Sequence, residues 1–271
     1  MRFASSALTV TEGDAAGRYH MINNVIADDW NHSPYSIDLN ENEVHIWRAS
    51  LNQDAKVMAN LSALLSQDEY QRAVSYYRPV DRDRFIAGRG ILRKIISAYL
   101  ALSPDELQFT YNEYGKPAVS DNQNTRALNF NLSHSAELVL YAVTRERVVG
   151  IDIEYIREDF ATLEIAEQFF SKDEVAALKS LPTDQRTTGF FNCWSRKESF
   201  IKAKGLGVSY PLDRFTVSVS PNEPPALLNV YGDEYEPTCW QMYELKTGEE
   251  YAASLIVENP PVVLRQWQWI G

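Results

Sequence analysis

Hydrophobic and polar positions repeat with two different periods along the chain, and each change of period marks an element. In the first half the pattern predicts a short strand over 44–47, helices over about 54–65, 67–77 and 83–100, and strands over 107–111, 127–133 and 138–144. Ser103 and Pro104 form the turn that ends the third helix. Residues 144–147 predict a hairpin turn into a further strand over 148–154.

The second half repeats this mixture of elements. Ser171 and Glu174 have the spacing of a capping box at a helix start, and a long helix is predicted from about 184 to 204, where Gly205 and Gly207 end it. Strands are predicted over 215–219, 240–244 and 251–257. Helices and strands alternate too irregularly for a doubly wound parallel sheet, so the pattern indicates an α+β fold.

The patterning also suggests a division of the chain. Residues 1–43 carry little periodic apolar pattern and many Asn, Asp, Ser and Gly residues, which predicts an N-terminal extension. The remainder is predicted to form an N-terminal subdomain over 44–148 and a C-terminal subdomain over 149–271. These two halves are similar in size and meet near Val148.

Composition and charge restrict the partners of the protein. Its 271 residues are 45% hydrophobic and 12% aromatic, which excludes a disordered chain. The net charge is 26 minus 37, or −11, so the surface as a whole repels nucleic acid and anionic lipid. No apolar run approaches the roughly 20 residues that span a bilayer, and the N-terminus lacks the order of a signal peptide. We therefore expect a cytoplasmic protein with no nucleic-acid or membrane partner, in which Cys193 and Cys239 are free thiols.

Asp152 and Glu154 share one face of the predicted strand VGIDIE. The alternation places Val149, Ile151 and Ile153 on the other face, so the two carboxylates lie about 6.6 Å apart along the strand. Taken alone, such a pair is typical of an acidic, solvated sheet face. Like charges on one face cost free energy unless a cation neutralises them, and magnesium prefers a few carboxylate oxygens completed by water and phosphate. The pair becomes a candidate metal site if a third ligand converges on it.

The candidate for the third ligand is Glu198, in the helical run WSRKESFIKAKGLG. Trp194, Glu198 and Lys202 are spaced four apart and project from one helix face. Glu198 and Lys202 could form an ordinary salt bridge, worth about a few tenths of a kcal/mol. The cations around this single Glu exceed what solubility requires, and their density favours an anion site made of Arg196, Lys197, Lys202 and Lys204.

Two further segments carry cations. Arg82, Arg89 and Arg93 form a stripe roughly 60° round the third helix from its apolar stripe, from which they can reach either into a cleft or out to water. Lys116 is presented by the turn Gly115-Lys116-Pro117, which could equally be only a turn.

The segment NLSHS, from Asn131 to Ser135, follows a strand and contains a serine beside a histidine. A nucleophilic Ser133 is a possible interpretation, but the flanks lack the G-x-S-x-G elbow and no acidic partner is nominated. Lone histidines at strand ends are mostly structural. Ser133 and His134 fit better as hydrogen-bond donors to a phosphate.

Taken together, these segments resemble the 4'-phosphopantetheinyl transferases, specifically the larger, Sfp-like class of holo-acyl- and peptidyl-carrier-protein synthases. The resemblance covers about residues 44–257, and four motifs in register are far more specific than any one of them. The matching segments are Tyr114 to Pro117 (YGKP), Asn131 to Ser135 (NLSHS), Gly150 to Glu154 (GIDIE) and Trp194 to Lys202 (WSRKESFIK), followed by Gly205, Gly207, Pro211, Leu212 and Phe215.

The resemblance implies a fold and a reaction. We expect a monomer of two pseudo-twofold-related α+β subdomains, with coenzyme A in the cleft and the metal site at their interface. The enzyme would transfer the 4'-phosphopantetheine arm of coenzyme A to a serine of an apo acyl, peptidyl or aryl carrier protein of fatty-acid, polyketide or nonribosomal-peptide biosynthesis. The cofactor would be Mg²⁺, with Mn²⁺ as a substitute, and adenosine 3',5'-bisphosphate would be released.

The resemblance also implies roles for individual residues. Asp152, Glu154 and Glu198 would be the metal ligands, Glu154 directly or through water. Glu198 would also help to deprotonate the carrier serine, and Lys202 would stabilise charge on the phosphates. Glu69 stands where members of the family can place a lysine for the 3'-phosphate, and Arg72 would substitute for that lysine. Coenzyme A would be contacted by Arg72, Arg89, Gly115, Lys116, Pro117, Ser133, His134, Asp152 and Lys202.

Two other functions use similar residues. A metal-dependent nuclease or phosphohydrolase also needs Asp, Glu and Lys clusters, but the net charge opposes a nucleic-acid substrate. Glu198 and Lys202 are four apart, whereas common nuclease signatures space these residues two apart. A carrier-binding module without activity is disfavoured, because a binder has no need to assemble like charges.

Overall fold

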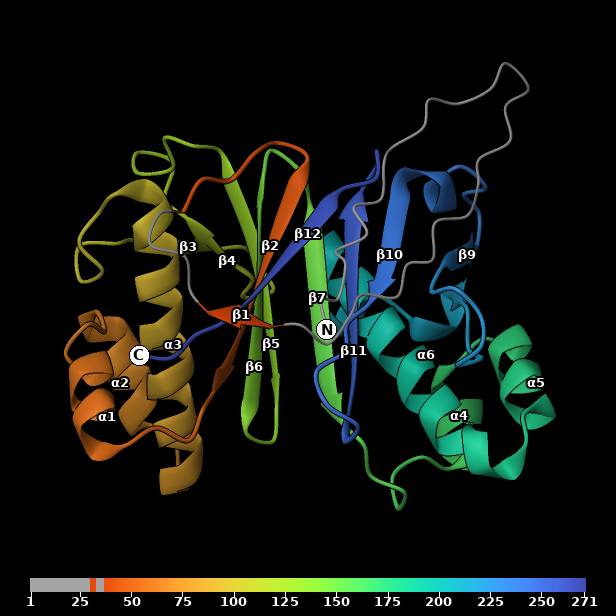
Figure 1. Cartoon of the computed structure of the whole chain (residues 1–271). Coiled ribbons are helices and arrows are strands. Elements are labelled where there is room, and N and C mark those ends of the chain that lie inside the picture. Colours follow the sequence, from red (N-terminus) through yellow and green to blue (C-terminus); the bar gives the residue numbers. More distant parts are fainter. Residues whose placement is uncertain (1–29, 33–36) are drawn as a thin grey trace, which may run out of the picture.

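The computed structural model describes residues 30–32 and 37–271. In it, two sheets lie face to face, and each is covered on its outer side by helices (Figure 1). The first sheet has the strand order β1-β12-β2-β6-β5 and the second the order β10-β11-β7. Two small sheets pair β3 with β4 and β8 with β9. The bounds are β1 Asn31–His32, β2 Glu43–Ser50, β3 Phe109–Tyr111, β4 Pro117–Val119, β5 Leu128–Ser135, β6 Leu138–Arg145, β7 Val149–Tyr155, β8 Phe215–Val217, β9 Leu227–Val230, β10 Trp240–Glu244, β11 Tyr251–Glu258 and β12 Val263–Gln268.

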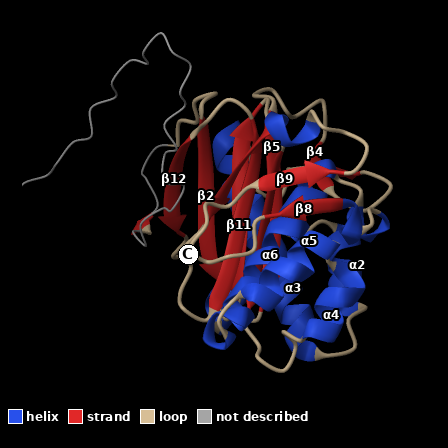
Figure 2. Ribbon diagram, turned by 90° about the vertical axis from the view of Figure 1, so that its right-hand side faces the viewer, coloured by secondary structure: helices blue, strands red, loops and turns tan. Residues whose placement is uncertain are grey.

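The α-helices of the described residues form two groups of three. The first group covers the first sheet, and the second group covers the second sheet, which Figure 2 views from its helical side. Short 3-10 helices, η1 Gly207–Ser209, η2 Leu212–Arg214 and η3 Glu236–Cys239, follow in the second half. The α-helices are α1 Ala55–Ser62, α2 Gln67–Val74, α3 Pro79–Leu100, α4 Leu163–Phe169, α5 Lys172–Ser180 and α6 Thr183–Lys204.

The two halves of the chain repeat one order of elements. Each begins with a strand, continues through three helices and later forms a strand hairpin, β5–β6 in the first half and β10–β11 in the second. The opening strand pairs with the second strand of that hairpin in both halves, β2 with β6 and β7 with β11. The third helix of each half, α3 or α6, has 22 residues. The α+β class with two related subdomains is confirmed.

Three apolar cores hold these layers together. One lies between α3 and the first sheet, one surrounds α6, and one lies between the two sheets. The strand β7 contributes Ile151 and Ile153 to the core between the sheets, so its opposite face turns towards α6. Gly150 lies on that opposite face, where a Cβ would come within 2.0 Å of the Ser199 carbonyl oxygen. Glycine therefore lets β7 lie directly on α6.

The predicted hairpin between the strands at 138–144 and 148–154 is wrong. The strand β6 pairs with β5 and β2, whereas β7 pairs with β11 in the other sheet. The intervening turn, in which the Thr144 hydroxyl donates to the Arg147 carbonyl, carries the chain from one sheet to the next. Because both strands are buried, the apolar pattern does not say which neighbour each one takes.

The ends of the described chain join the first sheet. The strand β12, which the pattern did not predict, pairs in parallel with β2 and brings the C-terminal end onto the N-terminal half. Leu39 is buried in the core under α3, and the Trp30 indole donates to the Lys246 carbonyl. The rest of the predicted extension, residues 1–29 and 33–36, lies outside the described residues. The subdomain boundaries at 44–148 and 149–271 stay a prediction, and residues 263–268 lie in the sheet of the first half.

The remaining elements follow the pattern closely. The long helix α6 ends at Gly205, whose left-handed backbone (φ +68°) is the conformation that favours glycine at a helix end. Ser171 and Glu174 form the predicted capping box of α5. The pattern missed α4, β4 and β9, which are short. Within the described residues, no helix has the length and apolar composition of a membrane span.

Candidate active site

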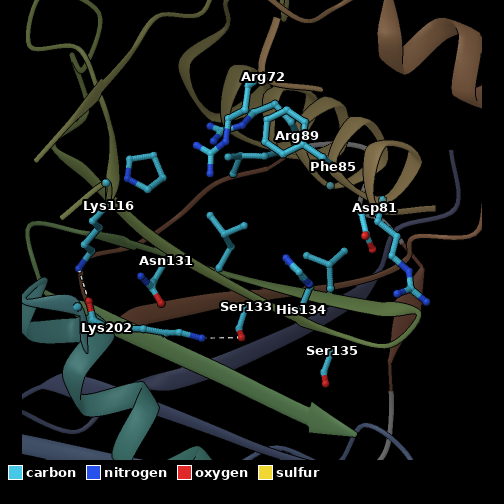
Figure 3. A pocket seen from close by; sticks show the side chains of 18 of the residues that line it. Arg72, Asp81, Phe85, Arg89, Lys116, Asn131, Ser133, His134, Ser135 and Lys202 are labelled. Atoms are coloured by element: carbon cyan, nitrogen blue, oxygen red, sulfur yellow. Dashed lines mark hydrogen bonds between the residues drawn. The ribbon is translucent and has the colours of Figure 1, made fainter. Parts of the chain in front are cut away.

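A pocket of about 720 Å³ opens between α3 and the edge strand β5 (Figure 3). In Figure 3, Arg72, Phe85 and Arg89 lie on one side of it, and Ser133, His134 and Ser135 lie on the other. The turn around Lys116 and the end of α6 at Lys202 close one end. Five Lys or Arg side chains line the pocket but only one carboxylate, Asp81, so an anion is attracted although the whole chain is acidic: Arg72, Arg84, Arg89, Lys116 and Lys202.

Arg89 and Arg93 lie one turn apart on α3 and share the buried carboxylate of Glu69. The Arg93 Nε atom is 2.6 Å from Glu69 Oε2, and its Nη1 donates to the carbonyls of Pro104 and Leu107 at 2.8 Å each. The Arg89 Nε atom is 3.6 Å from Glu69 Oε1, while its buried Nη1 donates no hydrogen bond within the described residues. Arg89 lines the pocket and Arg93 does not. Arg89 therefore retains a donor for a ligand, and Arg93 serves the fold.

Glu69 has a structural task. Its Oε2 atom accepts from the Ser66 backbone in the capping box of α2, besides accepting from Arg93. Its carboxylate is thus buried under the arginines of α3 and cannot face a phosphate. The substitute expected for a lysine here, Arg72, lies in the pocket wall with its guanidinium 5.3 Å from the centre of the Phe85 ring. Arg82 lies outside the pocket wall and pairs with Asp83 at the surface.

Lys116 contacts the C-terminal end of α6. Its Nζ donates to the carbonyls of Lys202 at 2.7 Å and Ala203 at 3.2 Å, and burial lowers the pKa of Lys116 to about 8. The Asn112 amide in the same turn donates to the Gly205 carbonyl at 2.8 Å. The last carbonyls of a helix have no partner inside it, so this turn caps α6. The end of the helix that carries Lys202 is thereby fixed to the N-terminal half.

Asp152 lies behind the pocket wall, where Ser133 and Lys202 cover it. Its Oδ1 atom accepts from Lys202 Nζ at 2.5 Å and from Ser133 Oγ at 2.8 Å, and Lys202 Nζ also donates to Ser133 Oγ at 2.7 Å. Its Oδ2 atom is buried and accepts no hydrogen bond from the described residues. An orphaned carboxylate oxygen costs free energy unless a donor or a cation meets it. The hydrogen bonding of the Asp152 carboxylate is therefore incomplete at Oδ2.

The other two candidate carboxylates are protonated more easily than usual. Burial, together with the negative charge of Asp152, raises the pKa of Glu154 to about 7. Burial and the charge of Asp152 also raise the pKa of Glu198. Asp152 therefore interacts electrostatically with both glutamates. In the part of the chain that the structure describes, however, no three His, Cys, Asp or Glu side chains are gathered as a metal cluster.

The site donors on β5 differ in their surroundings. Burial of the imidazole, with the charges of Lys202 and Arg84, lowers the pKa of His134, so this side chain is neutral at pH 7. Ser133 and His134 point to opposite sides of the strand, one towards Asp152 and one towards α3. Both line the pocket.

The predicted anion site of four cations on α6 is wrong for three of them. Lys197 is fully buried with its Nζ 2.6 Å from Glu174 Oε1, and Arg196 pairs with Glu244 at 3.3 Å. Lys204 pairs with Glu236 at 2.9 Å. Each cation has a carboxylate partner elsewhere in the sequence, which the local pattern cannot reveal. Among the four, Lys202 lines the pocket.

The structure thus brings most of the expected residues together. The pocket wall holds all of the expected ligand contacts except Asp152, which Ser133 and Lys202 cover. Of the metal-ligand candidates, Asp152 and Glu154 accept hydrogen bonds from the lining residues Ser133 and Ser135, and Glu198 does not line the pocket. Sequence reasoning missed Arg84, Tyr76 and Phe85 as lining residues, and it gave no role to Asn131 or Ser135. The spacing of Phe85, Gly88, Arg89 and Leu92 on α3 is that of one helix face, a signal that was present in the sequence.

Comparisons with known proteins match both halves of the chain. The model of the 4'-phosphopantetheinyl transferase superfamily matches residues 148–256, and the model of the N-terminal part of 4'-phosphopantetheinyl transferase matches residues 45–146. The chain is 38% identical over 228 residues to the 4'-phosphopantetheinyl transferase HetI of Nostoc sp., covering 84% of this chain and 93% of HetI. The chain belongs to the 4'-phosphopantetheinyl transferase superfamily.

Other transferases of this superfamily are also similar. The chain is 33% identical over 190 residues to the 4'-phosphopantetheinyl transferase Sfp of Bacillus subtilis, covering 70% of this chain and 81% of Sfp. A solved structure, the holo-[acyl-carrier-protein] synthase of Thermotoga maritima, aligns with a TM-score of 0.33 at 21% identity over 41% of this chain and 63% of its own. The predicted class, an Sfp-type phosphopantetheinyl transferase, is confirmed by the similarity to HetI and Sfp.

Proposed function

We propose that this transferase moves the 4'-phosphopantetheine moiety of coenzyme A to a serine of an apo acyl, peptidyl or aryl carrier protein, releasing adenosine 3',5'-bisphosphate. The enzyme acts in the cytosol as a monomer and depends on Mg²⁺, for which Mn²⁺ can substitute. Its metal ligands are Asp152, Glu154 and Glu198. Coenzyme A occupies the pocket between α3 and β5.

The charge of the pocket supports coenzyme A as the ligand. Its phosphates carry several negative charges, and five Lys or Arg side chains line the wall. Arg89 supports this most directly, because its guanidinium is buried against Glu69 yet keeps one Nη1 donor without a protein partner. Charge-assisted hydrogen bonds from such a donor to a phosphate are stronger than neutral ones. We assign the phosphates of coenzyme A to Arg72, Arg89, Lys116, Ser133, His134 and Lys202, and its adenine region to the turn Gly115 to Pro117.

The carboxylates fit a magnesium ion in kind. Asp152 offers a buried oxygen without a donor, and the pKa values of both neighbouring glutamates are raised by their burial and by the charge of Asp152. A divalent cation would relieve this repulsion, and hard carboxylate oxygens are what magnesium prefers. When bound, the ion would neutralise charge on the phosphates of coenzyme A during transfer.

The chain's own residues account for the movement of the proton and of the charge. The carrier serine oxygen forms a bond to the phosphorus that bears the pantetheine arm, the bridging P–O bond to the nucleotide breaks, and adenosine 3',5'-bisphosphate leaves. Glu198 accepts the serine proton, and burial together with the charge of Asp152 raises its pKa, which makes it a stronger base. Lys202, held beside Asp152 and Ser133, offsets charge on the phosphate groups.

A single observation carries this proposal. Asp152 pairs with Lys202 through Oδ1 and keeps a bare, buried Oδ2, behind the wall of a pocket lined by cations. The structural Glu69 also has a buried oxygen without a hydrogen bond from the described residues, but that Oε1 atom lies 3.6 Å from the Arg89 guanidinium, whereas the ion pair of Asp152 with Lys202 is made by Oδ1 and leaves Oδ2 bare. This arrangement also disfavours a carrier-binding module without activity, since binding alone needs no orphaned charge.

The test is incubation of the protein with coenzyme A, Mg²⁺ and a panel of apo carrier proteins, followed by intact mass measurement. We expect one carrier to gain the mass of one phosphopantetheine group, and we expect Asp152→Ala and Glu198→Ala to abolish the gain while the free energy of unfolding stays close to that of the parent. Full activity in either variant would sink the assignment of the carboxylates. Unchanged activity after removal of divalent cations would sink the metal dependence.

A further inference from the structure

The edge strand β5 and the edge strand β7 lie side by side without a backbone ladder between them. The strand β5 pairs with β6, and β7 pairs with β11. Side chains of β5 meet the backbone of β7 instead. The Asn131 Oδ1 atom accepts from the Ile151 N–H at 3.0 Å, and the Ser135 Oγ atom accepts from the Tyr155 N–H at 3.0 Å. Both pairs are separated by 20 residues in the sequence, so the two strands run in register and in parallel.

These two contacts flank the candidate metal ligands. Ile151 directly precedes Asp152, and Tyr155 directly follows Glu154. The backbone segment that carries both carboxylates is therefore held at each of its ends by one side chain of β5. Ser135 also donates from its Oγ atom to Glu154 Oε2 at 3.1 Å.

The middle position of β5 has another task. Ser133 lies between Asn131 and Ser135 on the same side of the strand, and its hydroxyl contacts Asp152 and Lys202. Asn131, Ser133 and Ser135, which alternate along β5, therefore have different contacts. The outer two hold the β7 backbone, and the central one contacts the charged groups of the site.

Direct pairing of the two edges would replace this arrangement with an ordinary sheet. In a paired sheet the backbone carbonyls of β5, and not its side chains, would accept from the Ile151 and Tyr155 N–H groups. Here side-chain acceptors of β5 satisfy two N–H groups on this edge of β7. Asn131 is 6% exposed, so its amide is held in place by its surroundings.

We propose that Asn131 and Ser135 are positioning residues for the transfer reaction: by holding the Ile151 and Tyr155 N–H groups, they fix Asp152 and Glu154 relative to Ser133 and Lys202. This inference rests on the proposed function, because it assigns the flanked carboxylates to the reaction. A displacement of about 1 Å at a reacting centre can cost about 100-fold in rate. Loss of either tether should therefore slow the reaction more than it weakens coenzyme A binding.

The variants are Asn131→Ala and Ser135→Ala, with two controls. Asn129→Ala removes the same residue type two positions earlier on the same strand, at an exposed position outside the pocket wall. Ser135→Thr keeps the hydroxyl and restores the tether. Ser135 is only partly buried, so Ser135→Ala tests the inference even if Asn131→Ala fails to fold.

Three quantities are measured for each variant: kcat at saturating coenzyme A, the Kd for coenzyme A by calorimetry without a carrier, and hydrogen exchange of the backbone amides of 149–155 by mass spectrometry. We expect both alanine variants to lower kcat by about 10- to 100-fold, to leave the Kd for coenzyme A unchanged and to exchange the Ile151 or Tyr155 amide faster. Asn129→Ala and Ser135→Thr should behave like the parent.

Two results would overturn the positioning role. One is a weaker Kd with unchanged kcat, which would make Asn131 a ligand contact. The other is unchanged amide exchange in the 149–155 segment with unchanged kcat in the folded protein. A parent enzyme that modifies no carrier would instead sink the proposed function, and hydrogen exchange would still decide whether the tethers exist.

Discussion

Two lysines of α6, five residues apart, form ion pairs of opposite character. Lys197 and Glu174 are both fully buried, and each is complete: Lys197 also donates to the Phe215 carbonyl, and Glu174 also accepts from the Ser171 and Val217 backbones. Lys202 is 28% exposed, and its partner Asp152 keeps a bare oxygen. The same chemical pair therefore serves the fold in one place and remains open to a ligand in the other.

The helix α3 repeats this contrast with arginines. Arg93 donates hydrogen bonds to Glu69 and to two backbone carbonyls. Arg89, one turn earlier, lines the pocket, contacts the same carboxylate more loosely and keeps a buried Nη1 donor without a hydrogen bond to the described residues. In both halves of the molecule a helix that carries a buried, satisfied cation also carries a cation that lines the pocket. Within the described part of the chain, Arg89 and Asp152 each keep a buried atom without a hydrogen bond, whereas Arg93, Lys197 and Glu174 do not; Glu69 Oε1 also accepts none, but it faces Arg89 Nε at 3.6 Å.

The largest effect on stability is expected from breaking the complete pair. Glu174→Gln leaves the Lys197 charge buried without a counter-ion, which should lower the free energy of unfolding by about 3–5 kcal/mol. Urea denaturation measures this change. The matched control is Glu167→Gln, since the pair between Glu167 and Lys179 is about half exposed and should contribute less than about 1 kcal/mol. Equal effects of the two substitutions would remove the distinction between the complete pair and a surface pair.

The next effect concerns the incomplete arginine. Arg89→Ala removes the free donor, and a hydrogen bond to a charged group contributes about 1.5–3 kcal/mol, so the Kd and KM for coenzyme A should rise about 10- to 100-fold with a smaller change in kcat. Calorimetry with coenzyme A and steady-state kinetics measure these quantities. Arg82→Ala, an exposed position of the same helix, is the control and should bind like the parent. An unchanged KM in Arg89→Ala would return Arg89 to a structural role.

The smallest effect extends the contrast to His45, a buried group that contacts a neutral hydroxyl and lies with its Nε2 atom 3.6 Å from the Glu43 carboxylate. His45 is buried with its Nδ1 2.8 Å from the Tyr99 hydroxyl, and burial lowers the pKa of His45 from 6.5 to about 4. Between these values the unfolded chain binds more protons than the folded one, so stability is fully present above pH 6.5 and falls as the pH drops towards 4. Between pH 7 and pH 5.5 His45 should account for a loss of roughly 1 kcal/mol.

The measurement is urea denaturation of the parent and of His45→Gln across that pH range. The substituted side chain does not titrate, so the variant should lose the part of the pH dependence that His45 supplies. Parallel stability curves for the two proteins would show that His45 does not resist protonation.

The sequence alone predicts much of the fold. Periodicity placed the strands at 44–47, 138–144 and 240–244, and capping signals placed the ends of α5 and α6, because these are local properties. The sequence pattern does not predict that β7 pairs with β11, because the apolar pattern of a strand buried on both faces does not indicate which strand lies beside it. It also missed β12, whose parallel pairing with β2 joins residues more than 200 positions apart.

The same limit applies to the site. Motifs named Ser133, His134, Lys116 and Lys202, and the structure gathers them at one pocket. They could not tell Lys197 from Lys202, because the carboxylate that satisfies each lysine comes from a distant segment. Nor could they separate Arg89 from Arg93, whose difference depends on the carbonyls of Pro104 and Leu107.

The most direct test compares a carboxylate of the candidate site, Glu198, with the structural carboxylate that pairs with Lys197, Glu174. The variants Glu198→Gln and Glu174→Gln are studied in one series. For each protein, phosphopantetheine transfer to an apo carrier is measured by intact mass, and the free energy of unfolding is measured in urea. We expect Glu198→Gln to lose transfer while it keeps its stability, and Glu174→Gln to lose stability while the folded fraction keeps transfer. Full transfer by Glu198→Gln would contradict the account, because the open carboxylate cluster would then have no part in the reaction.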